Sequence, residues 1–126
     1  MKTQMKINTY PIHTELVMNH SVANVLNSSF FEEFSAHITQ IDSSKNLIIT
    51  GNSRFFSSGL DLFHINDFNH DEIIQFMFKF ESMLELILER KGKTIAHING
   101  HTVAGGFILA SACDKVYCIP GNISWE

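Results

Sequence analysis

Short apolar segments alternate with helical segments along most of this chain, and this order restricts its possible folds more than any other feature. The apolar segments 46–51, 93–99 and 115–119 are short and bounded by polar or turn-forming residues, as buried strands are. Between them, segments 69–92 and 105–113 carry apolar residues at helical spacing. Strands joined through a helix run parallel in one sheet, because the crossover returns the chain to the same end. The sequence therefore predicts an α/β fold with βαβ-type units and a largely parallel sheet.

The N-terminal part of the chain predicts two further strands and one helix. Segments 5–12 and 13–19 have the composition of short strands. In segment 27–41 apolar residues recur every three or four positions, and Ser29 and Glu32 have capping-box spacing. We therefore expect a helix over 27–41 that is capped by this pair.

Segment 69–92 carries the strongest helical signal. Asn69 can cap its start, acidic residues follow in the first turn, and Gly92 can end it. Its apolar residues cover more than one face of the helix. Because a helix that is apolar on several faces is normally buried, we expect this one to be packed on several sides.

Composition excludes several classes of protein. The 126 residues suffice for one domain, and an apolar content of 44% with eleven Phe allows a substantial core. The net charge of -4 without a Lys/Arg cluster argues against a nucleic-acid partner. No apolar run approaches the roughly 20 residues that a membrane span needs, so no membrane partner is expected. Without a signal-peptide pattern, the default expectation is a cytoplasmic location.

The cysteines and histidines give no metal or disulfide signal. Cys113 and Cys118 lie in apolar segments, and we expect both to be reduced and buried. His97 is expected to be packed in a strand, whereas His101 lies in a turn where a proton-shuttling role is the alternative to a structural one. The other histidines are scattered and predicted to lie on the surface: His13, His20, His37, His64 and His70. We expect no metal site.

Two glycine turns, each between a strand and a helix start, suggest a chemical site. In "FSSGLDL" Gly59 follows small residues in the segment 52–62, which we expect to be a loop, and in "NGHTVAGGF" Gly105 and Gly106 precede a helix. The first N–H groups of a helix are unpaired and carry partial positive charge. Two backbone N–H groups aimed at one point would form an oxyanion hole without any charged side chain. The alternative is that both glycine motifs are only turns.

The segments that carry these turns resemble a known family. "NLIITGNSRFFSSGLDL" and "TIAHINGHTVAGGFILASACDKVY" are similar to the crotonase superfamily, the enoyl-CoA hydratases and isomerases, and "VMNHSVANVLNSSFFEEF" matches its N-terminal segment. The resemblance implies a crotonase-like ββα spiral core. It also implies that residues 1–126 form the N-terminal part of such a domain, truncated before the C-terminal trimerisation helices. For such a piece expressed alone, with its uncovered sheet edge, we expect self-association or dependence on a partner segment.

The resemblance assigns roles to both turns. The backbone N–H groups of Leu60 and Gly105 would hold the thioester oxygen of an acyl-CoA substrate, with no separate cofactor. The neighbouring residues would bind the substrate: Ser58, Gly59, Asp61, Ala104 and Gly106. A helix N-cap is the alternative for Asp61. Phe56 and Phe107 are expected in the core or the acyl pocket, and Ser57 and Ser58 are not expected to be nucleophiles because no His/Asp pattern accompanies them.

The third residue after Gly105 departs from the hydratase pattern. Hydratases of the family carry a glutamate there, whereas this chain has Ile108. An apolar residue at this position is similar to the family's Δ3,Δ2-enoyl-CoA isomerases, which act in fatty-acid β-oxidation and move one proton through a single glutamate. The resemblance implies that this base lies just beyond Glu126. Glu126 itself would be the base only if a short deletion separates this chain from the family, and the alternative is that Glu126 has no catalytic role. Whether this chain is itself an active enzyme therefore stays open.

Two alternatives to the isomerase hypothesis also stay open. In the first, the chain is a non-catalytic acyl-CoA binder or an inactive truncated family member. In the second, it supports another thioester reaction such as hydrolysis or decarboxylation. The resemblance implies a homotrimer or hexamer for full-length members, and the missing helices argue against that for this chain. It also leaves a mitochondrial or peroxisomal location open beside the cytoplasmic one.

Overall fold

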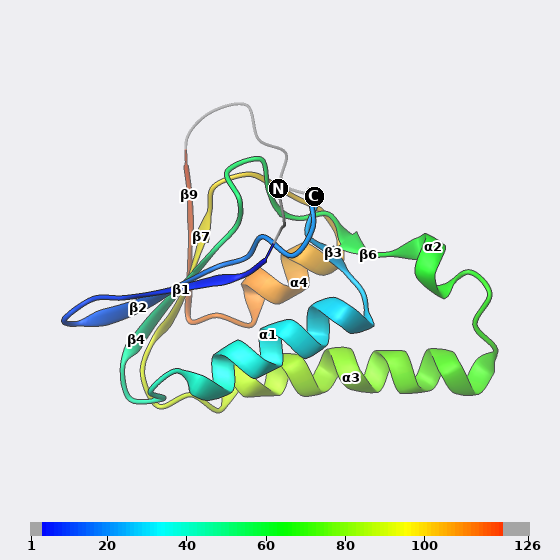
Figure 1. Cartoon of the computed structure of the whole chain (residues 1–126), viewed down its shortest axis with the longest axis horizontal. Helices are drawn as coiled ribbons and strands as arrows, with labels where there is room; N and C mark the ends of the chain where they lie inside the picture. Colours follow the sequence, from blue (N-terminus) through cyan, green and yellow to red (C-terminus); the bar gives the residue numbers. More distant parts are fainter. Residues whose placement is uncertain (1–3, 120–126) are drawn as a thin grey trace.

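A computed structural model of the chain describes residues 4–119, and its centre is a five-stranded sheet in the order β1-β2-β4-β7-β9 (Figure 1). The strands are β1 (Lys6–Thr9), β2 (His13–Val17), β4 (Asn46–Thr50), β7 (Thr94–Ile98) and β9 (Lys115–Cys118). β1 and β2 form an antiparallel hairpin, and every other neighbouring pair is parallel. The predicted α/β fold with a largely parallel sheet is therefore confirmed.

Helices connect the parallel strands and lie to one side of the sheet (Figure 1). They are α1 (Ser28–Gln40), α2 (Leu62–Ile65), α3 (His70–Leu88) and α4 (Gly105–Ser111). In β2 and β7 buried residues alternate with partly exposed ones, so one face of each strand packs into the core. The core is aliphatic in the sheet and aromatic between α1 and α3. There the rings of Phe31 and Phe80 stack with their centroids 5.5 Å apart.

The sequence predicted a loop over segment 52–62, but the structure contains short strands there. It contains β5 (Phe55–Ser57) and β6 (Gly59–Leu60), which pair in parallel with β8 (His101–Thr102) and β3 (Val25–Leu26), respectively. Each strand is only two or three residues long, so neither produces a periodic pattern in the sequence. These two small sheets bring the two glycine turns together.

Helix α1 begins two residues earlier than the capping-box prediction required. Its N-cap is Asn27, whose side chain accepts a hydrogen bond from the Phe30 N–H at 2.8 Å. The predicted pairing of Ser29 with Glu32 was therefore wrong, because both residues lie inside the helix. For α3 the predicted cap is confirmed: Asn69 and Glu72 form a reciprocal capping box.

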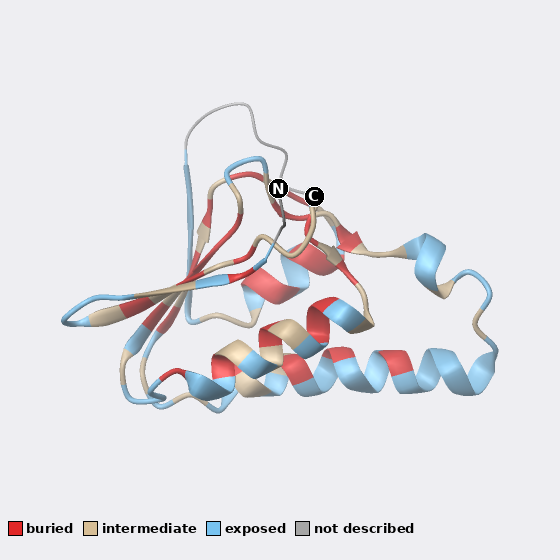
Figure 2. Cartoon of the chain, in the orientation of Figure 1, coloured by how far each residue is buried: buried red, intermediate tan, exposed pale blue. Residues whose placement is uncertain are grey.

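Helix α3 is packed on one side, not on several as its sequence predicted. Phe76, Phe80, Met83 and Ile87 are buried, whereas other apolar residues of the helix are exposed (Figure 2). The exposed ones are Ile73, Ile74, Met77, Phe78 and Leu88. The apolar pattern correctly predicted a helix, but the described residues cover only the face toward α1.

The prediction of two buried cysteines is half correct. Cys113 is partly buried, and burial raises the pKa of its thiol to about 12 with a further contribution from the Asp114 carboxylate. Cys118 is exposed instead, because β9 is an edge strand of the sheet. The apolar run 115–119 therefore predicted the strand correctly, but it did not determine whether the side chains of that strand are buried.

Two of the histidines predicted to lie freely on the surface converge on one carboxylate. His20 Nδ1 lies 2.6 Å from Glu33 Oε1, and His37 Nε2 lies 3.7 Å from Glu33 Oε2. The Met5 N–H also donates to Glu33 at 2.9 Å. This clasp ties the segment before β1 and the loop after β2 to α1. His20 and His37 are therefore partly exposed, as residues near the surface are, but they also have a structural partner that the sequence did not predict.

The clasp predicts a specific dependence of stability on acid. Partial burial alone would raise the pKa of Glu33, but the His20 hydrogen bond, the Met5 N–H and the nearby imidazoles outweigh it and hold this pKa below the usual 4.5. A lowered pKa in the folded state stabilises the fold above the unfolded value and loses this contribution as pH falls through the folded value. We therefore expect the unfolding free energy of Glu33→Gln to decrease less than that of the wild-type protein as pH falls below about 4.5.

Denaturant titrations at several pH values would measure this effect. Glu32→Gln is the matched control, because Glu32 is the neighbouring glutamate of the same helix and is exposed. If the unfolding free energies of the wild-type protein and of Glu33→Gln decreased equally with falling pH, the prediction would be contradicted.

Candidate active site

The turns at Gly59–Leu60 and Ala104–Gly105 lie against each other. A methyl group built on Gly59 would lie 3.2 Å from the Gly105 nitrogen, and one built on Gly105 would lie 3.4 Å from the Leu60 nitrogen. Segments that are 45 residues apart in sequence are thus in van der Waals contact. The structure therefore brings together the two residues that the sequence singled out, Leu60 and Gly105.

The N–H groups at these positions are oriented away from the regular structure. The Asp61 N–H donates to the Leu26 carbonyl at 3.0 Å, so by strand alternation the Leu60 N–H points away from β3. Gly105 is the first residue of α4, where an N–H has no partner within the helix. The next N–H, that of Gly106, donates to the Val103 carbonyl at 2.8 Å. The N–H groups of Leu60 and Gly105 are therefore not used by the β3–β6 pairing or by the helical hydrogen bonds of α4.

Both turns have unusual backbone conformations. Gly59 has φ +91°, which side chains rarely allow. Ala104 has φ 45° and ψ -107°, a strained conformation for a residue with a Cβ. Such strain persists only when the surrounding structure enforces it, and here it aims the start of α4 at Leu60. The motif "AGG" therefore does more than form a turn, because it sets the direction in which helix α4 begins.

The remaining predicted site residues surround this contact in structural roles. Asp61 is the N-cap of α2 and accepts from the His64 N–H at 3.2 Å, which confirms the capping alternative. The Ser58 N–H donates to the Ala23 carbonyl at 3.0 Å. Glu126, the candidate base, lies outside the described residues.

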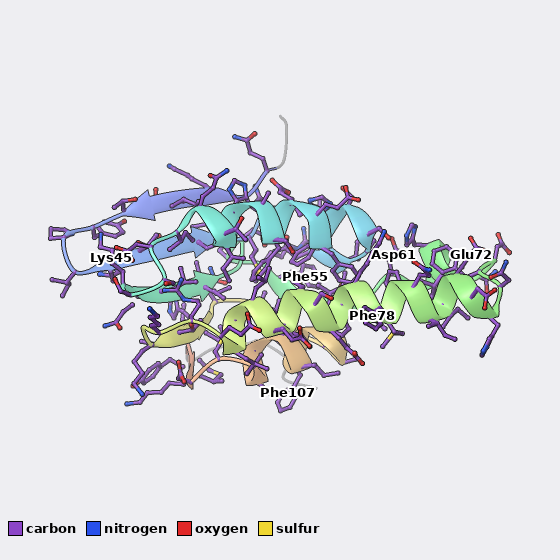
Figure 3. All side chains as sticks on the ribbon, turned by 90° about the horizontal axis from the view of Figure 1, so that it is seen from below. Lys45, Phe55, Asp61, Glu72, Phe78 and Phe107 are labelled. Atoms are coloured by element: carbon purple, nitrogen blue, oxygen red, sulfur yellow. The ribbon has the colours of Figure 1, made fainter. Side chains whose placement is uncertain are left out.

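The aromatic and apolar residues of the two motifs differ in burial. Phe56 is fully buried in the core, as one of the two alternatives predicted. Phe107 is 38% exposed and Ile108 is 49% exposed, and Figure 3 shows Phe107 projecting outward from α4. These two residues therefore present an apolar surface beside Gly105 and Gly106.

The two histidines near the second motif have structural contacts. His97 lies in β7, and its Nδ1 is 3.3 Å from the Thr50 hydroxyl, which confirms the predicted strand position. The His101 ring packs on Phe55 with ring centroids 5.5 Å apart. Neither contact requires proton transfer.

Two asparagines, the buried Asn24 and the half-buried Asn99, hold the loops around the site, and the sequence did not predict this role. Asn24 is fully buried and donates to the Met18 carbonyl at 2.9 Å. Asn99 exchanges two hydrogen bonds of 2.9 Å with Gly51, so the loops after β4 and β7 are joined. A single asparagine after a strand is too common a signal in a sequence to identify such a role.

A separate groove between α1 and α3 has a volume of about 540 Å³ and is lined by residues such as Phe31, Ile74 and Phe78. Neither Leu60 nor Gly105 lines it.

Within residues 4–119, no group of three or more His, Cys, Asp or Glu is arranged to hold a metal ion. None of the helices described is long and apolar enough to cross a membrane.

Comparisons with known proteins find one matching family and several relatives. The sequence profile of the family described as "Enoyl-CoA hydratase/isomerase" matches residues 14–120. The chain is 33% identical over 100 residues to "Enoyl-CoA delta isomerase 3" of Arabidopsis thaliana, covering 77% of this chain and 40% of that protein. It is 30% identical over 102 residues to a "Probable enoyl-CoA hydratase" of Bacillus subtilis, covering 78% of this chain and 40% of that protein.

A solved structure supports the same fold. An "enoyl-CoA hydratase/isomerase family protein" of Pseudomonas syringae superposes with a TM-score of 0.85 at 20% identity, covering 94% of this chain and 53% of that one. The chain therefore spans about 40% of the length of the two sequence relatives and about half of this structure.

Proposed function

This chain belongs to the enoyl-CoA hydratase/isomerase family, and on that premise we propose that it forms the thioester-binding half of a Δ3,Δ2-enoyl-CoA isomerase site. The observation that carries the proposal is the contact between the turns at Leu60 and Gly105. Two N–H groups from separate segments converge there beside an apolar surface. An acyl-CoA thioester oxygen is the ligand that this arrangement suits best.

The reaction needs only a base and this pair of donors. The base removes a proton from C2, the electrons move onto the thioester oxygen, and the two N–H groups stabilise the resulting enolate. The same group then returns the proton at C4, so the double bond moves into conjugation without loss or gain of atoms. We propose Glu126, or a glutamate further along the complete protein, as this base.

Isomerisation is favoured over hydration by the residue after the second turn. Ile108 cannot transfer a proton, whereas hydratases of the family carry a glutamate there. A relative with 33% identity is named an isomerase, and one with 30% identity is named a probable hydratase. The apolar side chain at 108 is therefore the feature that decides between the two reactions in this proposal.

A direct assay tests the proposal. We expect a 3-enoyl-CoA to be converted to the conjugated 2-enoyl-CoA, followed by the ultraviolet absorbance of the conjugated thioester. The 2-enoyl-CoA should not be hydrated at a comparable rate. Hydration as the faster reaction would contradict the isomerase assignment.

A non-catalytic acyl-CoA binder is the second candidate. It is favoured if neither Glu126 nor a later glutamate of the complete protein supplies the base. Calorimetry distinguishes it from the first: acyl-CoA binding without conversion supports the binder. Absence of both binding and conversion would contradict both candidates.

A further inference from the structure

Ser57 lies where the two turns of the candidate site are joined. It is fully buried, and its Oγ accepts a hydrogen bond from the Gly59 N–H at 3.2 Å. Its backbone carbonyl accepts a second bond from the Val103 N–H at 3.0 Å. Gly59 leads directly into Leu60, and Val103 leads into Ala104 and Gly105. One residue therefore holds the segments that carry both N–H donors.

Asn24 fixes the direction of the Ser57 hydroxyl. The Ser57 Oγ donates its single hydrogen to the Asn24 carbonyl at 2.8 Å, which leaves its lone pairs for the Gly59 N–H. The Asn24 side chain is anchored at both ends: Oδ1 accepts from the His20 N–H at 3.0 Å, and Nδ2 donates to the Met18 carbonyl at 2.9 Å. Asn24 also has φ 48°, a conformation that asparagine tolerates better than most residues. Its carbonyl is therefore held in place for Ser57.

Gly106 brings helix α4 up to the same residue. A methyl group on Gly106 would lie 2.4 Å from the Ser57 carbonyl oxygen and 2.8 Å from its Cβ, so the helix packs directly on Ser57. The side chain at 57 must therefore be small and must also form hydrogen bonds. Serine meets both requirements.

We propose that Ser57 is a positioning residue that sets the separation of the Leu60 and Gly105 N–H groups, with Asn24 orienting its hydroxyl. The inference rests on the proposed function only for what these N–H groups bind. Ser57 itself touches no substrate. It acts by coupling the β6 turn to the α4 turn.

Ser57→Ala removes the hydroxyl with little change in volume. The measurement is the infrared band of a carbonyl-labelled 2-enoyl-CoA bound to the 126-residue chain. Hydrogen bonds from both donors shift this band to lower frequency, and we expect the variant to lose much of the shift while its dissociation constant changes little. Where isomerisation is measurable, we expect kcat to fall about 10- to 100-fold, as misplacement of a catalytic group does, with KM nearly unchanged. Ser57→Cys should restore part of the shift, since a thiol is a weak donor and acceptor.

Thr94→Val is the matched control. Thr94 is 1% exposed, and its hydroxyl accepts from the Arg90 Nε at 3.2 Å at the start of β7, away from the turns. This variant also loses a buried hydrogen bond, but we expect the wild-type carbonyl shift. A folded Ser57→Ala variant with the wild-type shift would overturn the proposal.

Amide hydrogen exchange of the unmodified chain gives a test that needs no variant and no ligand. The Gly59 and Val103 amides should exchange much more slowly than those of Leu60 and Gly105. Equal exchange of Gly59 and Leu60 would overturn the positioning role even if Ser57→Ala failed to fold. If acyl-CoA binds to the wild-type chain without a carbonyl shift, the proposed function fails, and the exchange pattern still decides the role of Ser57.

Discussion

Replacing the Gly105 amide by an ester is expected to abolish most of the thioester polarisation at this site. The substitution exchanges one N–H for an oxygen and leaves the side chain and the steric contacts of the turn unchanged. Because Gly105 is the first residue of α4, no intrahelical hydrogen bond is lost with its N–H. Loss of one oxyanion-hole donor costs about 10²–10³-fold in rate. The same substitution at Leu60 should have an effect of similar size.

The measurements are the carbonyl band of bound 2-enoyl-CoA and the rate of isomerisation. An ester at His70 is the matched control, since His70 is likewise the first residue of a helix, α3, and lies outside the site. It should leave both quantities unchanged. If the esters at Leu60 and Gly105 behave like the ester at His70, these N–H groups do not hold the thioester oxygen.

Gly106→Ala is expected to cause the largest loss of stability among single substitutions near the site. The new Cβ would lie 2.4 Å from the Ser57 carbonyl oxygen, a distance at which backbone must move. Overpacking of this kind costs about 3 kcal/mol, a large part of the stability of a small domain. The displacement of α4 would also shift Gly105 relative to Leu60.

Urea unfolding measures this loss, and the adjacent Gly105→Ala is its control. A Cβ on Gly105 would approach the flexible end of the Leu26 side chain at 3.1 Å, which can adjust. Its stability should therefore change by less than about 1 kcal/mol, because alanine also favours the helix. Equal effects of the two substitutions would show that α4 does not pack on Ser57 as described.

Local patterns were sufficient to predict most of the regular structure. The apolar segment 46–51 predicted β4, and Asn69 correctly predicted the start of α3. The predicted stop at Gly92 was too late, because the helix ends at Leu88 and its C-cap is Glu89. The fold class followed from the order of these elements, because a helix between two strands favours a parallel crossover. The small strands β5 and β6 were missed, since two or three residues carry no periodicity.

Burial was harder to predict than secondary structure. Segment 69–92 is apolar on several faces, yet Phe78 is 68% exposed in the folded chain. Cys118 is exposed for a related reason: its strand lies at the edge of the sheet. An apolar pattern gives the period of an element, but which face is covered depends on what packs against it.

The sequence by itself determined the order of the elements, the two glycine turns and the absence of a charged side chain at the Ala104–Gly106 helix start. Those features depend on residue identity and on neighbours in the chain. Only the tertiary structure decided that Leu60 meets Gly105, that Ser57 joins their turns, and that Glu33 gathers His20 and His37. Apart from the Glu33–His37 pair, which is local to α1, these contacts join separate segments of the chain or depend on how distant strands pair. The distances and angles that make them specific exist only after the chain has folded.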